Sequence, residues 1–237
     1  MTNLSSKHIL GQAIARQVKH NQVLGLGTGS TAEEAIEAIG FRLKGEGIRV
    51  FGVATSNRCE ELAKNVGIEI IQSGEKPINW GFDGADEVEK ETFNLLKGGW
   101  GSMTREKSVA KKCPRWIVIV DQSKLVSQLG EKFPIPVEVK EDQMHRVIEN
   151  LYERYQPVDI VIRQKKDGTG EFRTDFGNPV IDVKVAPGSI KNEWEKEWEM
   201  IPGVVGTGLF LGGYPDEVWV ARGEGIEKVS GLGKRNL

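Results

Sequence analysis

The strongest constraint on the fold is a repeated pairing of a short apolar segment with a polar cluster directly after it. Apolar segments at 22–26, 48–54, 80–82 and 115–120 precede the clusters GTGST (27–31), TS (55–56), DGAD (83–86) and DQSK (121–124). The last segment is continuously apolar from Trp116, as expected of a parallel strand that is buried on both faces. Because the carboxyl ends of parallel strands meet at one edge of a sheet, we expect the four clusters to form one hydrophilic pocket.

Helices are predicted between these strands. Apolar residues recur with a helical period after Thr31, and a further helix over 57–65 ends at Gly67. The alternation of strands and helices predicts an α/β fold, with a Rossmann-like, mostly parallel sheet domain formed by 1–130 and 208–237. The last strand is expected at 217–221.

A different pattern begins at about residue 131. Strands are predicted at 133–139, 158–163, 171–174, 179–185 and from 204, with helices at 142–155 and 189–200. The second and third of these strands are joined by a hairpin turn at 167–170. The mixed order predicts a second, smaller ferredoxin-like α+β domain over 131–207. Trp194 and Trp198, one helical turn apart, are expected to pack in a core or an interface.

Composition excludes several classes of function. A net charge of −2 over 237 residues provides no electrostatic reason to expect nucleic acid or an anionic membrane as a partner. No stretch reaches the roughly 20 apolar residues of a membrane span. Cys59 and Cys113 lack zinc-type spacing and are expected to be buried thiols. These features favour a cytoplasmic protein without a metal site.

The cluster at 27–31 has the composition of a phosphate-binding loop before a helix, and a tight structural turn is the alternative. It is a poor dinucleotide motif, because the second strand ends in Thr55 and Ser56 without a ribose-binding acid, which disfavours an NAD-dependent dehydrogenase. Asp83 and Asp86 are candidates for metal ligands, an acid/base pair or turn caps.

The segment LLKGGWGSMTREK (95–107) combines a cation, a glycine-rich loop and a carboxylate. A short helix is predicted over 102–112, with Ser102 or Thr104 as its N-cap and Glu106 in or near its first turn. The backbone N–H groups of 98–101 and the Lys97 ammonium could then stabilise a developing negative charge. The alternative is a glycine-rich connection that carries surface charges.

Seven motifs together resemble the A type of ribose-5-phosphate isomerase. In the order and spacing of that family they are GLGTGSTA (25–32), DGADEV (83–88), LLKGG…TREK (95–107), DQSK (121–124), FPIPVEV (133–139), TDFGN (174–178) and IPGVVGTGLF (201–210). The resemblance implies an aldose–ketose isomerase that interconverts D-ribose 5-phosphate and D-ribulose 5-phosphate in the non-oxidative pentose phosphate pathway. It also implies a homodimer or homotetramer that uses no metal or coenzyme.

By the same resemblance, Glu106 moves the proton between C2 and C1 through a cis-enediolate, and Lys97 supplies positive charge to that intermediate. Asp83 and Asp86 are expected to hold sugar hydroxyls and to assist ring opening. The substrate-binding set implied by the resemblance is Thr28, Gly29, Ser30, Thr31, Asp83, Gly84, Ala85, Asp86, Lys97, Gly98, Gly99, Trp100 and Lys124.

Trp100 departs from the family, which usually has glycine there. An indole that points into the pocket would narrow it, whereas one that points outward would leave only its backbone N–H to act. Two other functions are alternatives. Acyl transfer of the coenzyme A transferase type would use Glu106 as a nucleophile, but no adenosine site is evident. A regulatory module that senses sugar phosphates would need a DNA-binding element, and the sequence contains no basic helix.

Overall fold

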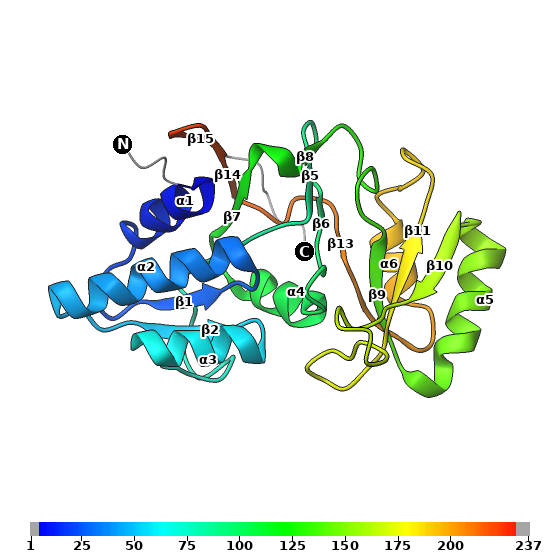
Figure 1. Ribbon diagram of the computed structural model, residues 1–237, viewed down its shortest axis with the longest axis horizontal. Helices are drawn as coiled ribbons and strands as arrows, with labels where there is room; N and C mark the ends of the chain where they lie inside the picture. The colour runs from blue at the N-terminus through cyan, green and yellow to red at the C-terminus, as the bar shows by residue number, and fades with distance from the viewer. Residues whose placement is uncertain (1–4, 231–237) are drawn as a thin grey trace. The chain divides into compact units, whose positions relative to one another are not determined.

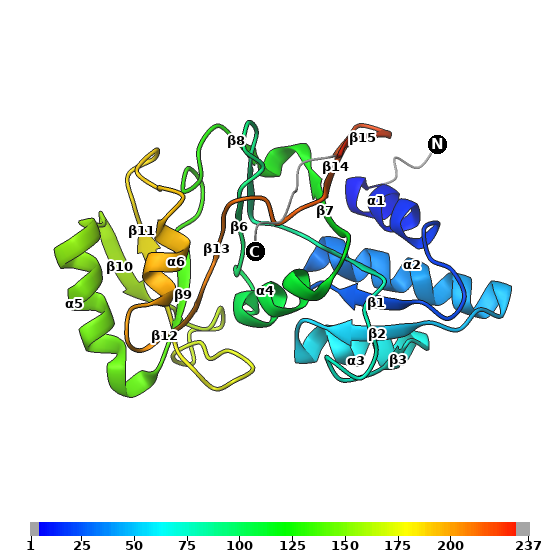
Figure 2. The same ribbon diagram turned by 180° about the vertical axis from the view of Figure 1, so that it is seen from behind.

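The computed structural model describes residues 5–230, which form two compact units (Figures 1 and 2). Among these described residues, the first unit comprises 5–85, 105–124 and 213–230, and the second comprises 86–104 and 125–212. Residues 1–4 and 231–237, which the sequence places in the first domain, lie outside the described part. Domain boundaries near residues 130 and 208 stay a prediction.

The first unit is built on a seven-stranded sheet in the order β15-β14-β7-β4-β1-β2-β3. Its strands are β1 (Val23–Leu26), β2 (Phe51–Ala54), β3 (Glu69–Ile70), β4 (Trp80–Asp83), β7 (Trp116–Asp121), β14 (Glu217–Arg222) and β15 (Gly225–Ser230). All pairs are parallel except β14 with β15. The predicted Rossmann-like sheet is therefore confirmed.

Helices of the first unit are α1 (Ser6–Ala15), α2 (Ser30–Glu46), α3 (Asn57–Val66) and most of α4 (Met103–Lys112), followed by a 3-10 turn η1 (Gln122–Lys124). The apolar sides of α1 and α2 join those of the strands in one core, where Ile14, Ile36 and Leu24 are fully buried. The α3 helix begins at its N-cap Ser56, whose Oγ accepts from Cys59 N at 3.0 Å. It ends as predicted at Gly67, which has φ +96°.

The second unit contains the predicted ferredoxin-like module. Strand β9 (Ile135–Val139), helix α5 (Met144–Tyr155), strands β10 (Asp159–Ile162) and β11 (Val180–Lys184), helix α6 (Trp194–Glu199) and strand β12 (Val204–Thr207) follow in the order βαββαβ, with a 3-10 turn η2 (Glu141–Gln143) before α5. The antiparallel sheet has the order β10-β11-β9-β12, and its four strands are labelled in Figure 2. Trp194 and Trp198 stack at 5.4 Å between ring centres in its core, as expected.

A small sheet of two- and three-residue strands was not predicted. It joins β5 (Glu87–Glu89), β6 (Leu95–Leu96), β8 (Leu125–Val126) and β13 (Leu209–Phe210) in the order β13-β6-β5-β8. The fully buried carboxylate of Glu87 accepts from the backbone N–H groups of Gly130, Lys132 and Phe133 at 2.7, 2.6 and 2.9 Å. These strands are too short to show a sequence period. They form because segments that are distant in the sequence pair with one another.

Three predicted elements were wrong in extent. The strand expected at 171–174 is reduced to isolated bridges, because Glu171 pairs with Gln164 and Arg173 pairs with Pro179, and neither pairing extends into a ladder. The helix expected at 189–200 is only α6, which begins at Trp194. The strand at 217–221 is not the last, since β15 returns antiparallel to it after Gly223, which has φ +56°.

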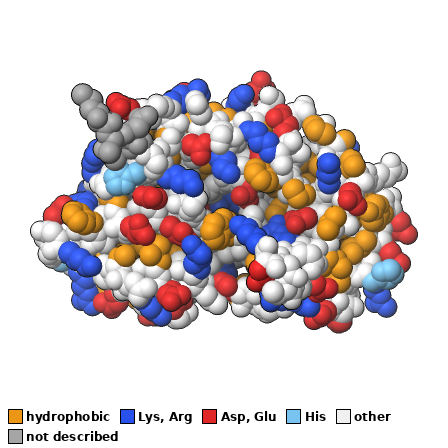
Figure 3. All heavy atoms as spheres, in the orientation of Figure 1, with side chains coloured by type: hydrophobic (Ala, Val, Ile, Leu, Met, Phe, Trp, Pro, Cys, Tyr) orange, Lys and Arg blue, Asp and Glu red, His pale blue; other side chains and the backbone are white. Residues whose placement is uncertain are grey.

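Surface features agree with the composition. On the face shown in Figure 3, acidic and basic side chains are interspersed over the helices of the first unit. Among residues 5–230, no helix combines the length and the apolar character needed to cross a bilayer.

Candidate active site

Three of the four polar clusters meet at the carboxyl edge of the parallel sheet. Thr28, after β1, has its Oγ1 2.8 Å from Thr55 Oγ1 and 2.7 Å from Ser56 Oγ, both of which follow β2. The backbone N–H of Thr28 donates to Asp83 Oδ1, at the end of β4, at 3.0 Å. The fourth cluster follows β7, which pairs with β4. The expected gathering of these loops at one edge is confirmed.

Asp83 is fully buried, and its Oδ1 is fixed by two backbone donors. Besides Thr28 N, Gly84 N donates to this oxygen at 2.8 Å, so the carboxylate also closes its own turn. Gly27 allows this approach, because a Cβ at position 27 would lie 2.5 Å from Asp83 Cγ and 2.6 Å from its Cα. The carboxylate thus takes up the space that a side chain at position 27 would need.

The loop of residues 27–31 leads directly into α2, which begins at Ser30. Gly29 precedes the helix with φ 111°, and Thr31 lies in the first turn. The N-terminus of this 17-residue helix therefore points its backbone N–H groups toward the sheet edge, where they favour an anion.

Lys7, which was not among the predicted site residues, also reaches this loop. Its Nζ donates to Ser30 Oγ at 2.7 Å. Burial works to raise the pKa of Asp121, but hydrogen bonds from Ser123 and the charges of Lys124 and Lys7 lower it below its ordinary value. Two lysines therefore lie near the edge that carries the loop. No local sequence pattern marks Lys7, because α1 meets this edge only through tertiary packing.

Glu106 lies in the first turn of α4 and is buried. Its neighbour Arg105 donates to Asn57 Oδ1 at 2.8 Å and to the Ala54 carbonyl at 3.3 Å, which holds this part of α4 to the end of β2. Ser102 directly precedes the helix. Thr104 lies within the helix and is not the N-cap, because its hydroxyl donates to the Glu138 carboxylate instead.

In the second unit, Lys97 is buried, with its Nζ 5.7 Å from the centre of the Phe210 ring. Its backbone N–H donates to the Gly208 carbonyl at 2.9 Å. The next glycines do not present a row of open donors, contrary to the expectation. Gly99 N donates to Asp86 Oδ2 at 2.7 Å, and Gly101 N donates to the Gly98 carbonyl at 2.9 Å.

Trp100 is partly exposed, with 40% of its surface accessible to solvent. Lys166 Nζ lies 5.2 Å from the centre of its indole ring, within the range of a cation–π contact. The adjacent Gly101 has φ +77°, and a Cβ there would lie 2.5 Å from Phe172 Cζ. The residue that departs from the family pattern therefore packs with the segment that follows β10.

Glu138 is a second residue that the sequence did not reveal. Its carboxylate is buried and accepts from Thr174 Oγ1 at 2.7 Å, from Asn178 Nδ2 at 2.9 Å and from Thr104 Oγ1. It thereby joins the start of α4 to the TDFGN segment. Strand alternation in IPVEV is the one available signal, since it places this residue on the opposite face from the core valines.

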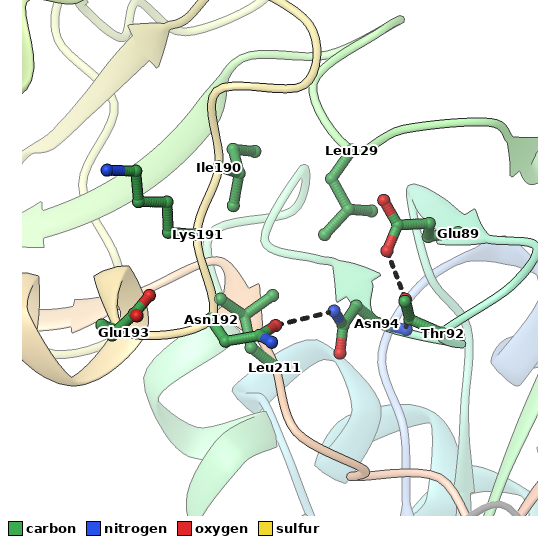
Figure 4. Close-up of a pocket in the computed structure, with 9 residues that line it drawn as sticks. All are labelled: Glu89, Thr92, Asn94, Leu129, Ile190, Lys191, Asn192, Glu193 and Leu211. Atoms are coloured by element: carbon green, nitrogen blue, oxygen red, sulfur yellow. Dashed lines mark hydrogen bonds between the residues drawn. The ribbon is translucent and has the colours of Figure 1, made fainter.

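A separate pocket of about 400 Å³ in the second unit contains none of the predicted site residues (Figure 4). Leu129, Ile190 and Leu211 provide apolar lining. On the polar side, Asn94 Nδ2 donates to Asn192 Oδ1 at 3.4 Å, and Asn94 Oδ1 accepts from Gly212 N.

The fold and the sheet edge together are typical of α/β enzymes that act on small phosphorylated molecules. Residues 51–225 match the family described as ribose 5-phosphate isomerase A (phosphoriboisomerase A). The ribose-5-phosphate isomerase A of Methanocaldococcus jannaschii is 41% identical over 229 residues, which cover 96% of this chain and 98% of the relative. That of Gluconobacter oxydans is 38% identical, covering 93% and 94%.

Two solved structures are similar over nearly their whole length. The ribose 5-phosphate isomerase A of M. jannaschii superposes with a TM-score of 0.89 at 40% identity, covering 95% of this chain and 98% of that one. A D-ribose-5-phosphate isomerase in complex with phospho-erythronic acid has a TM-score of 0.90 at 33% identity, covering 97% and 100%. The chain belongs to the ribose 5-phosphate isomerase A family. It is an isomerase of the aldose–ketose type.

Proposed function

We propose that this chain interconverts D-ribose 5-phosphate and D-ribulose 5-phosphate through a cis-enediolate, in the non-oxidative pentose phosphate pathway. The observation that carries the proposal, beyond family membership, is the hydrogen-bonded gathering of Thr28, Ser56 and Asp83 at the sheet edge. Lys7 and Lys124 add positive charge near it. A carboxylate that can accept from sugar hydroxyls, beside a helix N-terminus whose partial positive charge favours an anion, suits a phosphorylated sugar.

Glu106 is proposed as the acid/base. Isomerisation needs one group that removes a proton from the carbon next to the carbonyl and returns it to the other carbon. A carboxylate can do both, and a buried one is kept from the bulk water that would exchange the transferred proton. Its burial in the first turn of α4 supports this role.

Lys97 is proposed to stabilise the negative charge that develops on the enediolate oxygens. A buried ammonium acts there in a medium of low dielectric, where a fixed charge has a larger effect than in water. Asp83 and Asp86 are proposed to orient sugar hydroxyls and to assist ring opening.

The remaining substrate-binding residues are proposed in two groups. Thr28, Gly29, Ser30 and Thr31, with Lys124 and the newly found Lys7, would serve the phosphate or nearby hydroxyls. Gly84, Ala85, Gly98, Gly99 and Trp100 would contact the sugar. A homodimer or homotetramer and a cytoplasmic location stay predictions, of which the first is tested by sedimentation velocity.

The function is tested by a coupled assay of ribose 5-phosphate conversion in the presence of EDTA. We expect activity in the wild type and, for Glu106→Gln, a kcat lower by about 10²- to 10⁴-fold, the usual contribution of general acid–base catalysis. Glu61→Gln on α3 is the matched control, since its exposed carboxylate lies on a helix surface. An inactive wild type would refute the function, whereas a loss below about tenfold in Glu106→Gln would refute the base.

A further inference from the structure

Arg163 directly follows β10 and forms a two-pronged ion pair with Asp182 on β11. Its Nε donates to Asp182 Oδ2 at 2.8 Å, and its Nη2 donates to Oδ1. Both side chains are largely buried, with 14% and 19% of their surface exposed. The antiparallel register places Val161 opposite Asp182, so Arg163 is its diagonal neighbour on the same face of the sheet. The planar guanidinium is thereby held in one orientation.

The third nitrogen of this guanidinium reaches the glycine-rich loop. Nη1 donates to the Gly98 carbonyl at 2.7 Å and lies 3.5 Å from that of Gly99. The same Gly98 oxygen accepts from Gly101 N at 2.9 Å. Gly98 has φ +98°, a conformation that few other residues adopt, so the carbonyl is oriented by two donors in a backbone segment that has little steric restraint of its own.

The peptide that joins Gly98 to Gly99 carries this restraint to Asp86. A peptide unit is planar and rigid, with its C=O and N–H on opposite sides. Arg163 holds the C=O on one side, and on the other side the Gly99 N–H donates to Asp86 Oδ2 at 2.7 Å. One guanidinium therefore fixes, through a single rigid plane, the donor that orients the Asp86 carboxylate.

We propose that Arg163 is a positioning residue for the isomerase reaction, which acts on Asp86 through the Gly98–Gly99 peptide. The inference rests on the proposed function, because it assigns Asp86 to the sugar. Asp182 is part of the same device, since it holds the guanidinium in place.

The test compares kcat and KM for ribose 5-phosphate in Arg163→Met, Arg163→Lys, Asp86→Asn and the double variant Asp86→Asn/Arg163→Met. We expect Arg163→Met to lower kcat by about 10- to 100-fold, the range of a small misplacement of a reacting group. KM should change much less, and Arg163→Lys should recover part of the loss. Because Arg163 acts through Asp86, adding Arg163→Met to Asp86→Asn should lower kcat by less than about threefold further.

Arg173→Met is the matched control. Arg173 also pairs with carboxylates in the second unit, those of Glu141 at 2.7 Å and Glu171 at 3.0 Å. The kcat of Arg173→Met should stay within about twofold of the wild-type value. The exchanged pair Arg163→Asp/Asp182→Arg separates positioning from stability. It restores opposite charges but moves the guanidinium to β11. The melting temperature should therefore be closer to the wild-type value than that of Arg163→Met, while kcat stays as low as in Arg163→Met.

Three results would overturn the positioning role and leave the proposed function intact. One is a wild-type kcat for Arg163→Met while Asp86→Asn is slow. The others are a double variant whose loss in kcat equals the product of the two single losses, and an exchanged pair whose kcat returns to the wild-type value. A wild-type kcat for Asp86→Asn would instead refute the assignment of Asp86 in the proposed function. If Arg163→Met does not fold, Arg163→Lys and its double variant with Asp86→Asn decide by the same criteria.

Discussion

Gly27→Ala tests whether the close contact between β1 and β4 shapes the sheet edge. The new Cβ would lie 2.6 Å from Asp83 Cα, a backbone atom, so rotation of the Asp83 side chain cannot relieve the overlap. Overpacking of this kind costs about 1–3 kcal/mol. The displaced carboxylate also loses the hydrogen bond from Thr28 N, which costs about 1.5–3 kcal/mol for a charged acceptor. The lower entropy of the unfolded chain offsets about 0.4–1 kcal/mol.

The net loss is therefore about 3 kcal/mol, which corresponds to a fall in melting temperature of about 6–12 °C for a chain of this size. Calorimetry measures it, and the coupled assay should show kcat lower by about 100-fold because Asp83 is displaced. Gly45→Ala in α2 is the control, since a Cβ there meets no atom within 4 Å among residues 5–230, and it should be neutral or slightly stabilising. A melting temperature for Gly27→Ala within about 1 °C of the wild type would refute the reasoning.

Two further predictions concern titratable groups. Burial works to raise the pKa of Glu217, but hydrogen bonds from Arg115 at 2.5 Å and Trp219 at 2.7 Å lower it below its ordinary 4.5. This carboxylate therefore stabilises the fold above that pH, and the stabilisation is lost as the pH falls. Thermal melts of Glu217→Gln should show a flatter decline than the wild type between about pH 5 and pH 3, and parallel declines would contradict this. Burial raises the pKa of Cys59 to about 12, so Ellman's reagent should label this thiol at pH 8 only after unfolding, as followed by mass spectrometry of the labelled peptide.

Much of the fold follows from local pattern. The unbroken apolar run at 116–120 predicted a strand buried on both faces, and β7 lies inside the parallel sheet. The small sheet of β5, β6, β8 and β13 could not be predicted, because strands of two or three residues have no period to detect. The strand expected at 171–174 failed because Glu171 and Arg173 pair with different segments, at Gln164 and Pro179, and a local pattern does not reveal how such pairings are divided.

The sequence by itself determined that Gly/Ser/Thr and Asp clusters follow parallel strands, and hence that they meet at one edge. Their proximity is a consequence of strand direction, which apolar runs and helical periods reveal. Tertiary structure alone decided that Lys7 donates to Ser30. It also decided the two bonds of the Gly98–Gly99 peptide, whose N–H donates to Asp86 and whose carbonyl accepts from Arg163. These contacts join residues that are up to 65 positions apart, and hydrogen bonds depend on register and side-chain direction to within a fraction of an ångström.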